Sequence, residues 1–223
     1  AIKMITLLGL NKVLAVYVGP AGYAAIGQFQ NALQVITIFT GGAITNGVVK
    51  YTAEYHEQPE QQVKLWKTAG FVAICGSLVA ALLVASFSKE LASLFLKDAA
   101  LSGVFLWFAG VVVFFSLNIL LLAILNGRKE IVLYIVANIA GSLLSFSVTF
   151  YLATSFGLYG ALVALVVYQS ISFIVTLLLC LRTNWFKLSF LFGRPDKKIT
   201  KKLFAFFLMA VVSAACVPLA QML

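Results

Sequence analysis

The chain has 223 residues, of which 62% are hydrophobic and only 10% are charged, and its formal net charge is +9. Too few polar residues are present to cover the surface of a water-soluble domain. The composition therefore indicates a polytopic membrane protein. The stretch from Ile131 to Leu181 contains no Asp, Glu, Lys or Arg. A spanning helix needs about 20 apolar residues, whereas a transmembrane barrel would show shorter segments of alternating polarity. We therefore predict an all-α transmembrane helical bundle.

Gly and Pro residues divide the apolar stretches into seven predicted helices, because the turns between spans must lie outside the hydrocarbon. In chain order the helices cover residues 2–18, 24–55, 64–87, 99–125, 131–154, 159–181 and 202–222. We predict a six-helix lobe over residues 1–181, a basic cytoplasmic linker over 182–201, and the first helix of a truncated second lobe over 202–223. Because no polar flank precedes the first helix, the chain is expected to begin inside a longer reading frame.

The basic residues are distributed unevenly between the two ends of these helices. Twelve of the 16 fall on one side, at Lys50, Lys64, Lys67, Arg128, Lys129, Arg182, Lys187, Arg194, Lys197, Lys198, Lys201 and Lys202. The opposite side carries only Lys89 and Lys97. This imbalance follows the positive-inside rule, so we predict a cytoplasmic N-terminus. The positive charge then belongs to the membrane interface, which argues against a nucleic-acid partner and favours contact with membrane lipids.

The first predicted helix contains Lys12, seven positions before the Gly19-Pro20 turn. At about 1.5 Å per residue, its ammonium lies roughly 10 Å below the outer boundary. A lysine at the centre of a span costs about 2.5 to 3.5 kcal/mol, so it usually faces a cavity, a bundle interior or a counter-charge. Two interpretations stay open, a cavity lysine that contacts an anion and a snorkelling or structural lysine.

The second predicted helix is unusually polar on one face. Gln30, Gln34 and Thr37 fall within a narrow arc at about 100° per residue, together with Gly41 and Thr45. Such a face either lines a cavity or bonds to a neighbouring helix, and polar interhelical contacts contribute only about 0.6 kcal/mol each. The combined stripe favours a cavity.

Farther along the same helix, Asn46, Lys50 and Glu54 form a second stripe with i, i+4 spacing. This spacing allows Lys50 and Glu54 to pair near the cytoplasmic end. Gly41 precedes the stripe and allows a bend. The predicted substrate-binding residues are therefore Lys12, Gln30, Gln34, Thr37, Asn46 and Lys50.

The remaining polar residues predict neither an enzyme nor a metal or cofactor site. His56 is the only histidine and is expected in a solvated loop. Three cysteines without metal-binding spacing are expected to be buried apolar residues, namely Cys75, Cys180 and Cys216. A weaker stripe is expected to serve mostly packing, at Asn138, Ser142, Ser145 and Thr149.

Three segments of the sequence resemble a known family. The run from Asn11 to Tyr23, NKVLAVYVGPAGY, resembles the opening of polysaccharide-lipid flippases of the multidrug/oligosaccharidyl-lipid/polysaccharide (MOP) superfamily. The run GAITNGVVKY from Gly42, followed by Glu54-Tyr55-His56 and Pro59, is similar to the O-antigen and enterobacterial common antigen flippases. The later turn FGLYGA, residues 156–161, also matches a hairpin of that superfamily.

This resemblance implies two six-helix lobes related by pseudo-two-fold symmetry around a cationic cavity. It implies transport of an undecaprenyl-pyrophosphate-linked oligosaccharide from the cytoplasmic to the periplasmic leaflet of the bacterial inner membrane, by alternating access. Lys12 would contact the pyrophosphate, and Gln30, Gln34 and Thr37 would face the sugars. Other polysaccharide assembly proteins would be further partners.

The sequence departs from the family because it holds one lobe and the start of a second. A missing second lobe or a second copy of the chain would have to complete the cavity. A cation-coupled multidrug exporter of the same superfamily is the first alternative, although a cationic substrate would ordinarily require a buried acid, and none lies in the four helices over residues 64–181. A non-transporting membrane scaffold is the second alternative. A membrane enzyme acting on polyprenyl phosphates comes last, because no acid/base residues are apparent.

Overall fold

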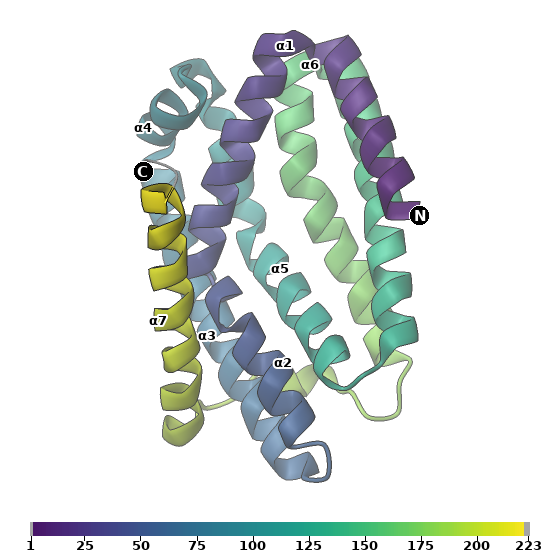
Figure 1. Cartoon of the computed structure of the whole chain (residues 1–223), viewed down its shortest axis with the longest axis vertical. Helices are drawn as coiled ribbons and strands as arrows, with labels where there is room; N and C mark the ends of the chain where they lie inside the picture. The colour runs from purple at the N-terminus through teal and green to yellow at the C-terminus, as the bar shows by residue number, and fades with distance from the viewer. Residues whose placement is uncertain (1, 221–223) are drawn as a thin grey trace.

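The computed structural model describes residues 2–220 as an all-helical bundle (Figure 1). The side chains of residues 2, 3, 5, 7, 211 and 213–220 lie outside this description, Cys216 among them. The long helices are α1 (Ile2–Phe39), α3 (Pro59–Ser86), α5 (Ser102–Gly127), α6 (Ile131–Leu181) and α7 (Lys197–Ala220). The short elements are η1 (Gly42–Ile44), α2 (Thr45–Glu54), α4 (Ser88–Leu91), η2 (Ala92–Leu96), η3 (Ala99–Leu101) and η4 (Leu188–Leu191). The all-α prediction is confirmed.

Helices α1 and α6 are each a hairpin of two arms, and each turn is made at a glycine. Gly19 interrupts α1 with φ 75° and ψ 175°, and Gly157 interrupts α6 with φ 57° and ψ −135°. Figure 1 shows both hairpins turning at the upper end of the bundle, where the first arm of each helix meets the second. Glycine adopts these backbone angles without a Cβ clash. The glycine punctuation in the sequence therefore predicted both turns correctly.

Replacing Gly19 with alanine is expected to destabilise the protein through the backbone alone. A Cβ at Gly19 meets nothing within 4 Å, so no clash contributes. The φ and ψ angles lie in a region that only glycine occupies readily, which costs other residues about 1 to 3 kcal/mol. Gly27→Ala is the matched control, because Gly27 is helical, has equally open space and should gain helix propensity. Thermal unfolding in detergent should rank G27A above G19A, and equal midpoints would contradict this explanation.

The predicted helix over residues 24–55 is not continuous, so this prediction is wrong in its extent. It breaks after Phe39, and the following segment Gly42–Glu54, which includes α2, is bent by 69° relative to Leu8–Phe39. Gly41 makes the break with φ 106°, and its Cα lies so close to α3 that an added Cβ would stand 3.2 Å from Ala73. The two adjacent glycines cost the helix stability and permit this close approach. The two polar stripes therefore point in different directions.

Three helices are long and apolar enough to cross a membrane, at Pro59–Ser86, Ala99–Gly127 and Ile131–Leu181. The bent pair Leu8–Phe39 and Gly42–Glu54 forms a fourth candidate. Each arm of α6 holds more than 20 residues, which at about 1.5 Å per residue is enough to span the hydrocarbon. This count refers to the described residues.

Two hydrophobic clusters stabilise opposite halves of the bundle. One surrounds Phe29 and Phe105, whose rings meet edge to face with centroids 5.3 Å apart, and joins α1 to α5 and to the second arm of α6. The other surrounds Trp66, Leu121 and Leu191 and joins α2, α3, α5 and the start of α7. Helices α3, α5 and α6 contribute to both clusters and so connect the two halves.

The connections between helices separate into two ends. The α2–α3, α5–α6 and α6–α7 connections lie at the lower end in Figure 1, and α4 lies with the two hairpin turns at the upper end. The lower end therefore contains the segments in which most basic residues are found. The side of the membrane that each end faces stays a prediction from charge.

The segment between α6 and α7, residues 182–196, is packed against the bundle. Phe186 and Leu191 are buried, and the backbone nitrogen of Asp196 donates to the hydroxyl of Thr68 at 3.1 Å. The Asp196 carboxylate accepts from the backbone nitrogens of Lys198 and Ile199 and caps the start of α7. The charge pattern predicted the basic character of this segment and gave no sign of its packing.

Candidate functional site

The second arm of α1 presents amides on its exposed face and hydrophobic residues on its buried face. Ile26, Phe29 and Leu33 are buried at helical spacing, whereas Gln30 and Gln34 are exposed. This exposed face belongs to a helix that is part of a candidate span. Primary amides facing lipid would leave several hydrogen-bonding groups unsatisfied. The face is therefore suited to line an aqueous cavity or to meet another polar surface.

Thr37 has a different role from the two glutamines. Its hydroxyl donates to the backbone oxygen of Gln34 at 3.0 Å, and the side chain is only partly exposed. Asn31 is exposed beside Gln30 and Gln34 and extends their polar face, although the stripe in the sequence did not include it. Its position one residue after Gln30 and three before Gln34 could have suggested this.

The structure does not bring the six predicted binding residues into one site. Lys12 is exposed on the first arm of α1, on the other side of the Gly19 turn from Gln30 and Gln34. Asn46 and Lys50 are exposed on α2, beyond the bend. None of the six lines the polar cavity described below. Their assignment to substrate stays a prediction.

Lys50 does not pair with Glu54 as the spacing suggested, and no ion pair joins them in the described part of the chain. Its ammonium lies over the rings of Tyr51 and Phe206, at 5.4 and 5.9 Å from their centroids. The pairing was predicted along α2 alone, whereas α7 supplies the aromatic ring that competes for the ammonium. This contact joins α2 to α7.

A polar cavity of about 320 Å³ lies between the first arm of α1, helix α5 and both arms of α6. The described residues that line it are neutral polar and apolar, at Thr6, Leu10, Asn118, Leu122, Ala137, Asn138, Gly141, Ser142, Ser145, Tyr168, Gln169, Ser172 and Thr176. The stripe Asn138, Ser142 and Ser145, expected to serve packing, lies on this cavity, while Thr149 is buried.

Two buried oxygens in this cavity have no hydrogen-bond partner. They are Oδ1 of Asn118 and Oγ of Ser172, on residues exposed by 2% and 4%. A buried oxygen without a partner costs about 1 to 3 kcal/mol, and a cavity of this size has room for water. Among the side chains that the structure describes, neither a carboxylate nor a cationic group lines the cavity, and this lining suits water or a neutral hydrogen-bonding group.

The lower end of the bundle holds a network around Arg128, which follows α5. One guanidinium nitrogen donates to Oε1 of Gln62 at 2.8 Å, and Nε2 of Gln62 donates to the backbone oxygen of Thr52 at 2.7 Å. The guanidinium also lies 4.4 Å from the ring centroid of Trp185. Burial lowers the pKa of Arg128 from its usual value, and the nearby Glu130 acts in the opposite direction. The network ties α2, α3 and the α6–α7 segment together.

The structure also tests the predictions about the cysteines and about His56. Cys75, expected to be buried, is exposed on α3, while Cys180 is buried as expected. Cys75 belongs to the outer face of α3, which the apolar sequence could not distinguish from its inner face. His56 is exposed after α2. Within the described residues, no group of three or more His, Cys, Asp or Glu side chains could hold a metal ion.

The chain is similar to known transporters in sequence and in fold. Lipid III flippases from Escherichia coli (strain K12) and Shigella flexneri are each 26% identical over 215 residues, which is 96% of this chain and 51% of each flippase. The chain thus spans about half the length of these curated relatives.

Solved structures show the same half-length match. A MOP superfamily transporter from Pyrococcus furiosus superposes with a TM-score of 0.78 at 18% identity, over 99% of this chain and 52% of that one. An outward-facing multidrug resistance MATE family transporter of the MOP superfamily gives a TM-score of 0.70 at 18% identity, with the same coverage. The fold is therefore that of half of such a transporter. A family model described as polysaccharide biosynthesis protein matches residues 2–223, and the chain accordingly belongs to the polysaccharide biosynthesis protein family.

Proposed function

We propose that this chain is the N-terminal half of a flippase that moves an undecaprenyl-pyrophosphate-linked oligosaccharide from the cytoplasmic to the periplasmic leaflet of the bacterial inner membrane. The observation that carries the proposal is the family match over nearly the whole chain. The similarity to flippases of lipid III supports a lipid-linked substrate. An O-antigen or enterobacterial common antigen repeat is the proposed oligosaccharide.

The exposed amides of α1 support a cavity for sugars. Gln30 and Gln34 cannot remain in contact with lipid without cost, so in the whole protein this face is proposed to meet an aqueous cavity. Amides both donate and accept hydrogen bonds, which matches sugar hydroxyls. The exposed ammonium of Lys12 is proposed to face the pyrophosphate, because a charged donor binds a phosphate oxygen about twice as strongly as a neutral one.

The division of the chain follows from this proposal. Residues 1–181 would be one lobe, 182–201 the basic linker on the cytoplasmic side, and 202–223 the opening of the second lobe. A second lobe or a second copy of the chain would close the cavity over the exposed face of α1. Alternating access would then be movement of one lobe against the other.

Complementation of bacteria that lack a flippase tests this proposal, with the amount of surface polysaccharide as the measurement. The full reading frame that contains the chain would be expressed in two bacterial strains, one without its O-antigen flippase and one without its lipid III flippase. Restoration of surface polysaccharide in either strain is expected. Failure in both strains, with normal protein in the membrane, would contradict the proposal, and measured resistance to drugs would then favour the multidrug exporter.

The amide face is expected to be required for this rescue. The double variant Gln30→Leu and Gln34→Leu removes the hydrogen-bonding groups and keeps much of the side-chain volume. Rescue should fall about fivefold or more, given about 0.5 to 1.5 kcal/mol for each of two neutral hydrogen bonds. Gln61→Leu is the control, because Gln61 is exposed near the start of α3, far from this face in sequence. Full rescue by the double variant would exclude a sugar-binding role for this face.

A further inference from the structure

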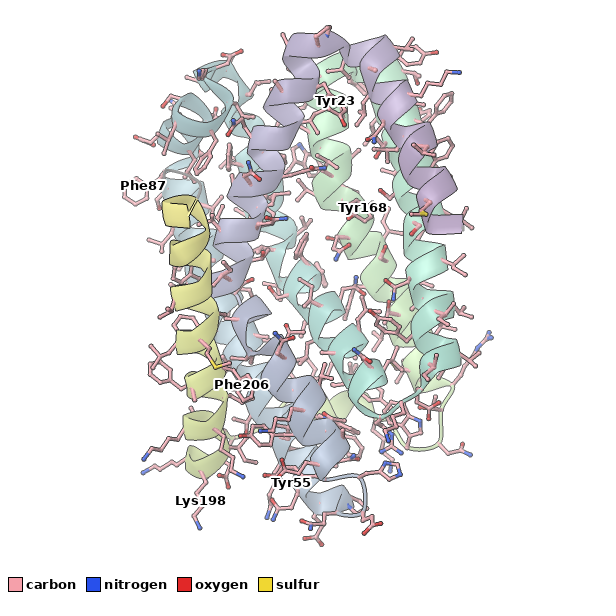
Figure 2. The ribbon with its side chains drawn as sticks, viewed as in Figure 1. Tyr23, Tyr55, Phe87, Tyr168, Lys198 and Phe206 are labelled. Carbon is pink, nitrogen blue, oxygen red and sulfur yellow. The ribbon has the colours of Figure 1, made fainter. Side chains whose placement is uncertain are left out.

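A long apolar groove runs along the side of the bundle between α3, α7 and the second arm of α1. Its volume is about 870 Å³, and its wall is hydrophobic almost throughout. Phe39 and Phe71 flank it near the lower half, Cys75 lies in its wall, and Phe87 marks its upper end. Figure 2 shows Phe87 beside the upper part of α7, and Phe206 in the lower part of that helix.

The lower end of the groove continues directly into a cluster of aromatic and cationic residues. Phe207 lines the groove and meets Phe39 with ring centroids 6.3 Å apart. The neighbouring residue, Phe206, meets Tyr51 of α2 at 5.9 Å. Tyr51 in turn stacks on Tyr55 at 6.0 Å, which Figure 2 shows at the lower end of the bundle. An aromatic surface thus joins the groove to the basic end of the protein.

Two ammonium groups share this aromatic surface. Nζ of Lys202 donates to the hydroxyl of Tyr55 at 2.8 Å and lies 5.0 Å from the ring centroid of Tyr51. Nζ of Lys50 lies 5.4 Å from the centroid of the same Tyr51 ring. Within the described residues neither lysine forms an ion pair, although Glu54 is close enough to act on Lys202. Two like charges held beside one ring favour the approach of an anion.

The groove and the cluster together match the shape of an anionic lipid, which has a long apolar chain and a charged headgroup. An apolar chain would lie in the groove, and its phosphate would lie at the membrane interface beside the two lysines. Lys202 precedes Phe207 by five residues, so its Cα lies about 7 Å beyond that end of the groove. A free snorkelling lysine has no such fixed partner, whereas Lys202 is positioned by its bond to Tyr55.

The length of the groove distinguishes between lipids. The residues of α3 that line it run from Phe71 to Val84, which is about 20 Å at 1.5 Å per residue. One leaflet offers only about 15 Å of hydrocarbon, half of the usual 30 Å core. A groove of this length suits a chain longer than a phospholipid acyl chain. We propose that it holds the polyprenyl chain of a polyprenyl pyrophosphate, with the pyrophosphate between Lys50 and Lys202, a position that the lipid would occupy before its pyrophosphate reaches Lys12. This inference rests on the proposed function for its substrate class.

Photocrosslinking of the full-length protein tests this site. A photoreactive polyprenyl pyrophosphate would be added to protein in phosphatidylcholine nanodiscs, and the labelled peptides would be identified by mass spectrometry. We expect labels on residues 71–87 and on the first half of α7. Excess undecaprenyl pyrophosphate should remove the label, and excess phosphatidylglycerol should leave it. Labels elsewhere, or equal competition by phosphatidylglycerol, would overturn the proposal.

Matched variants separate the two parts of the site. Lys50→Ala with Lys202→Ala should reduce labelling at least about tenfold, since each basic residue near the surface contributes about 1 kcal/mol to the binding of an anionic lipid. Lys50→Arg with Lys202→Arg should retain it. The control pair Lys198→Ala and Lys201→Ala lies exposed at the same end of α7 and should retain it. Unchanged labelling in the double alanine variant would refute the role of the two lysines.

The groove itself is tested on α3. Cys75→Trp should fill the groove and reduce labelling severalfold, whereas Leu78→Trp should not, because Leu78 is exposed on the same helix and does not line the groove. Rescue of surface polysaccharide, measured separately, keeps the two proposals apart. A protein that restores polysaccharide but takes no label in the groove refutes this site alone. A protein that takes the label without restoring polysaccharide retains the site and refutes the flippase.

Discussion

Trp66→Ala is expected to destabilise the protein more than any other single truncation in the lower half of the bundle. Trp66 is 1% exposed, and its ring lies between Trp185 and Phe190, with centroids 5.7 and 6.2 Å away. Its indole nitrogen donates to Oγ1 of Thr52 at 3.1 Å. Truncating a buried tryptophan costs about 3 to 5 kcal/mol, which is a large part of the stability of a typical domain. The fraction of monodisperse protein left after heating in detergent would measure this loss.

Trp107→Ala is the control for this prediction. Trp107 is on α5 and is 51% exposed, so its removal should change stability by about 0.5 kcal/mol. The two variants remove the same side chain, and only burial and the bond to Thr52 differ. An equal loss of stability in the two variants would show that Trp66 does not hold the α6–α7 segment.

Gly70→Ala is expected to detach the α6–α7 segment from α3. A Cβ at Gly70 would collide with the backbone oxygen of Leu191, and the backbone on both sides is held in place. Leu191 is completely buried, and displacing it exposes a side chain whose burial contributes about 1.5 to 3 kcal/mol. The segment should then be cleaved faster by trypsin after Arg182 and Lys187, which are both exposed.

Gly110→Ala separates the clash from the general effect of a helical glycine. Gly110 lies in α5 with no atom within 4 Å of an added Cβ. Alanine there should raise helix stability by up to about 1 kcal/mol and leave trypsin cleavage of the α6–α7 segment unchanged. If trypsin cleaves G70A as slowly as G110A, the prediction is wrong. The α6–α7 segment would then accommodate the added Cβ and stay packed against α3.

The surroundings of the polar residues could not be predicted from the sequence. Asn118, Ser142 and Ser172 are far apart in the chain, and the stripe that contains Ser142 was expected to serve packing, yet all three line one cavity. Helical periodicity places residues on one face of their own helix, but it cannot state which other helix that face meets. Lys50 illustrates the same limit, because its aromatic partner Phe206 comes from α7.

The sequence by itself determined the membrane class, the number of helical segments, the turns at Gly19 and Gly157 and the clustering of basic residues in the connections at one end. These depend on composition and on local backbone preference, which short stretches of chain encode. Only the tertiary structure decided the bend at Gly41, the packing of the α6–α7 segment, the polar cavity and the apolar groove. Each of these depends on contacts between segments distant in the chain, and such contacts leave no periodic signal in a single sequence.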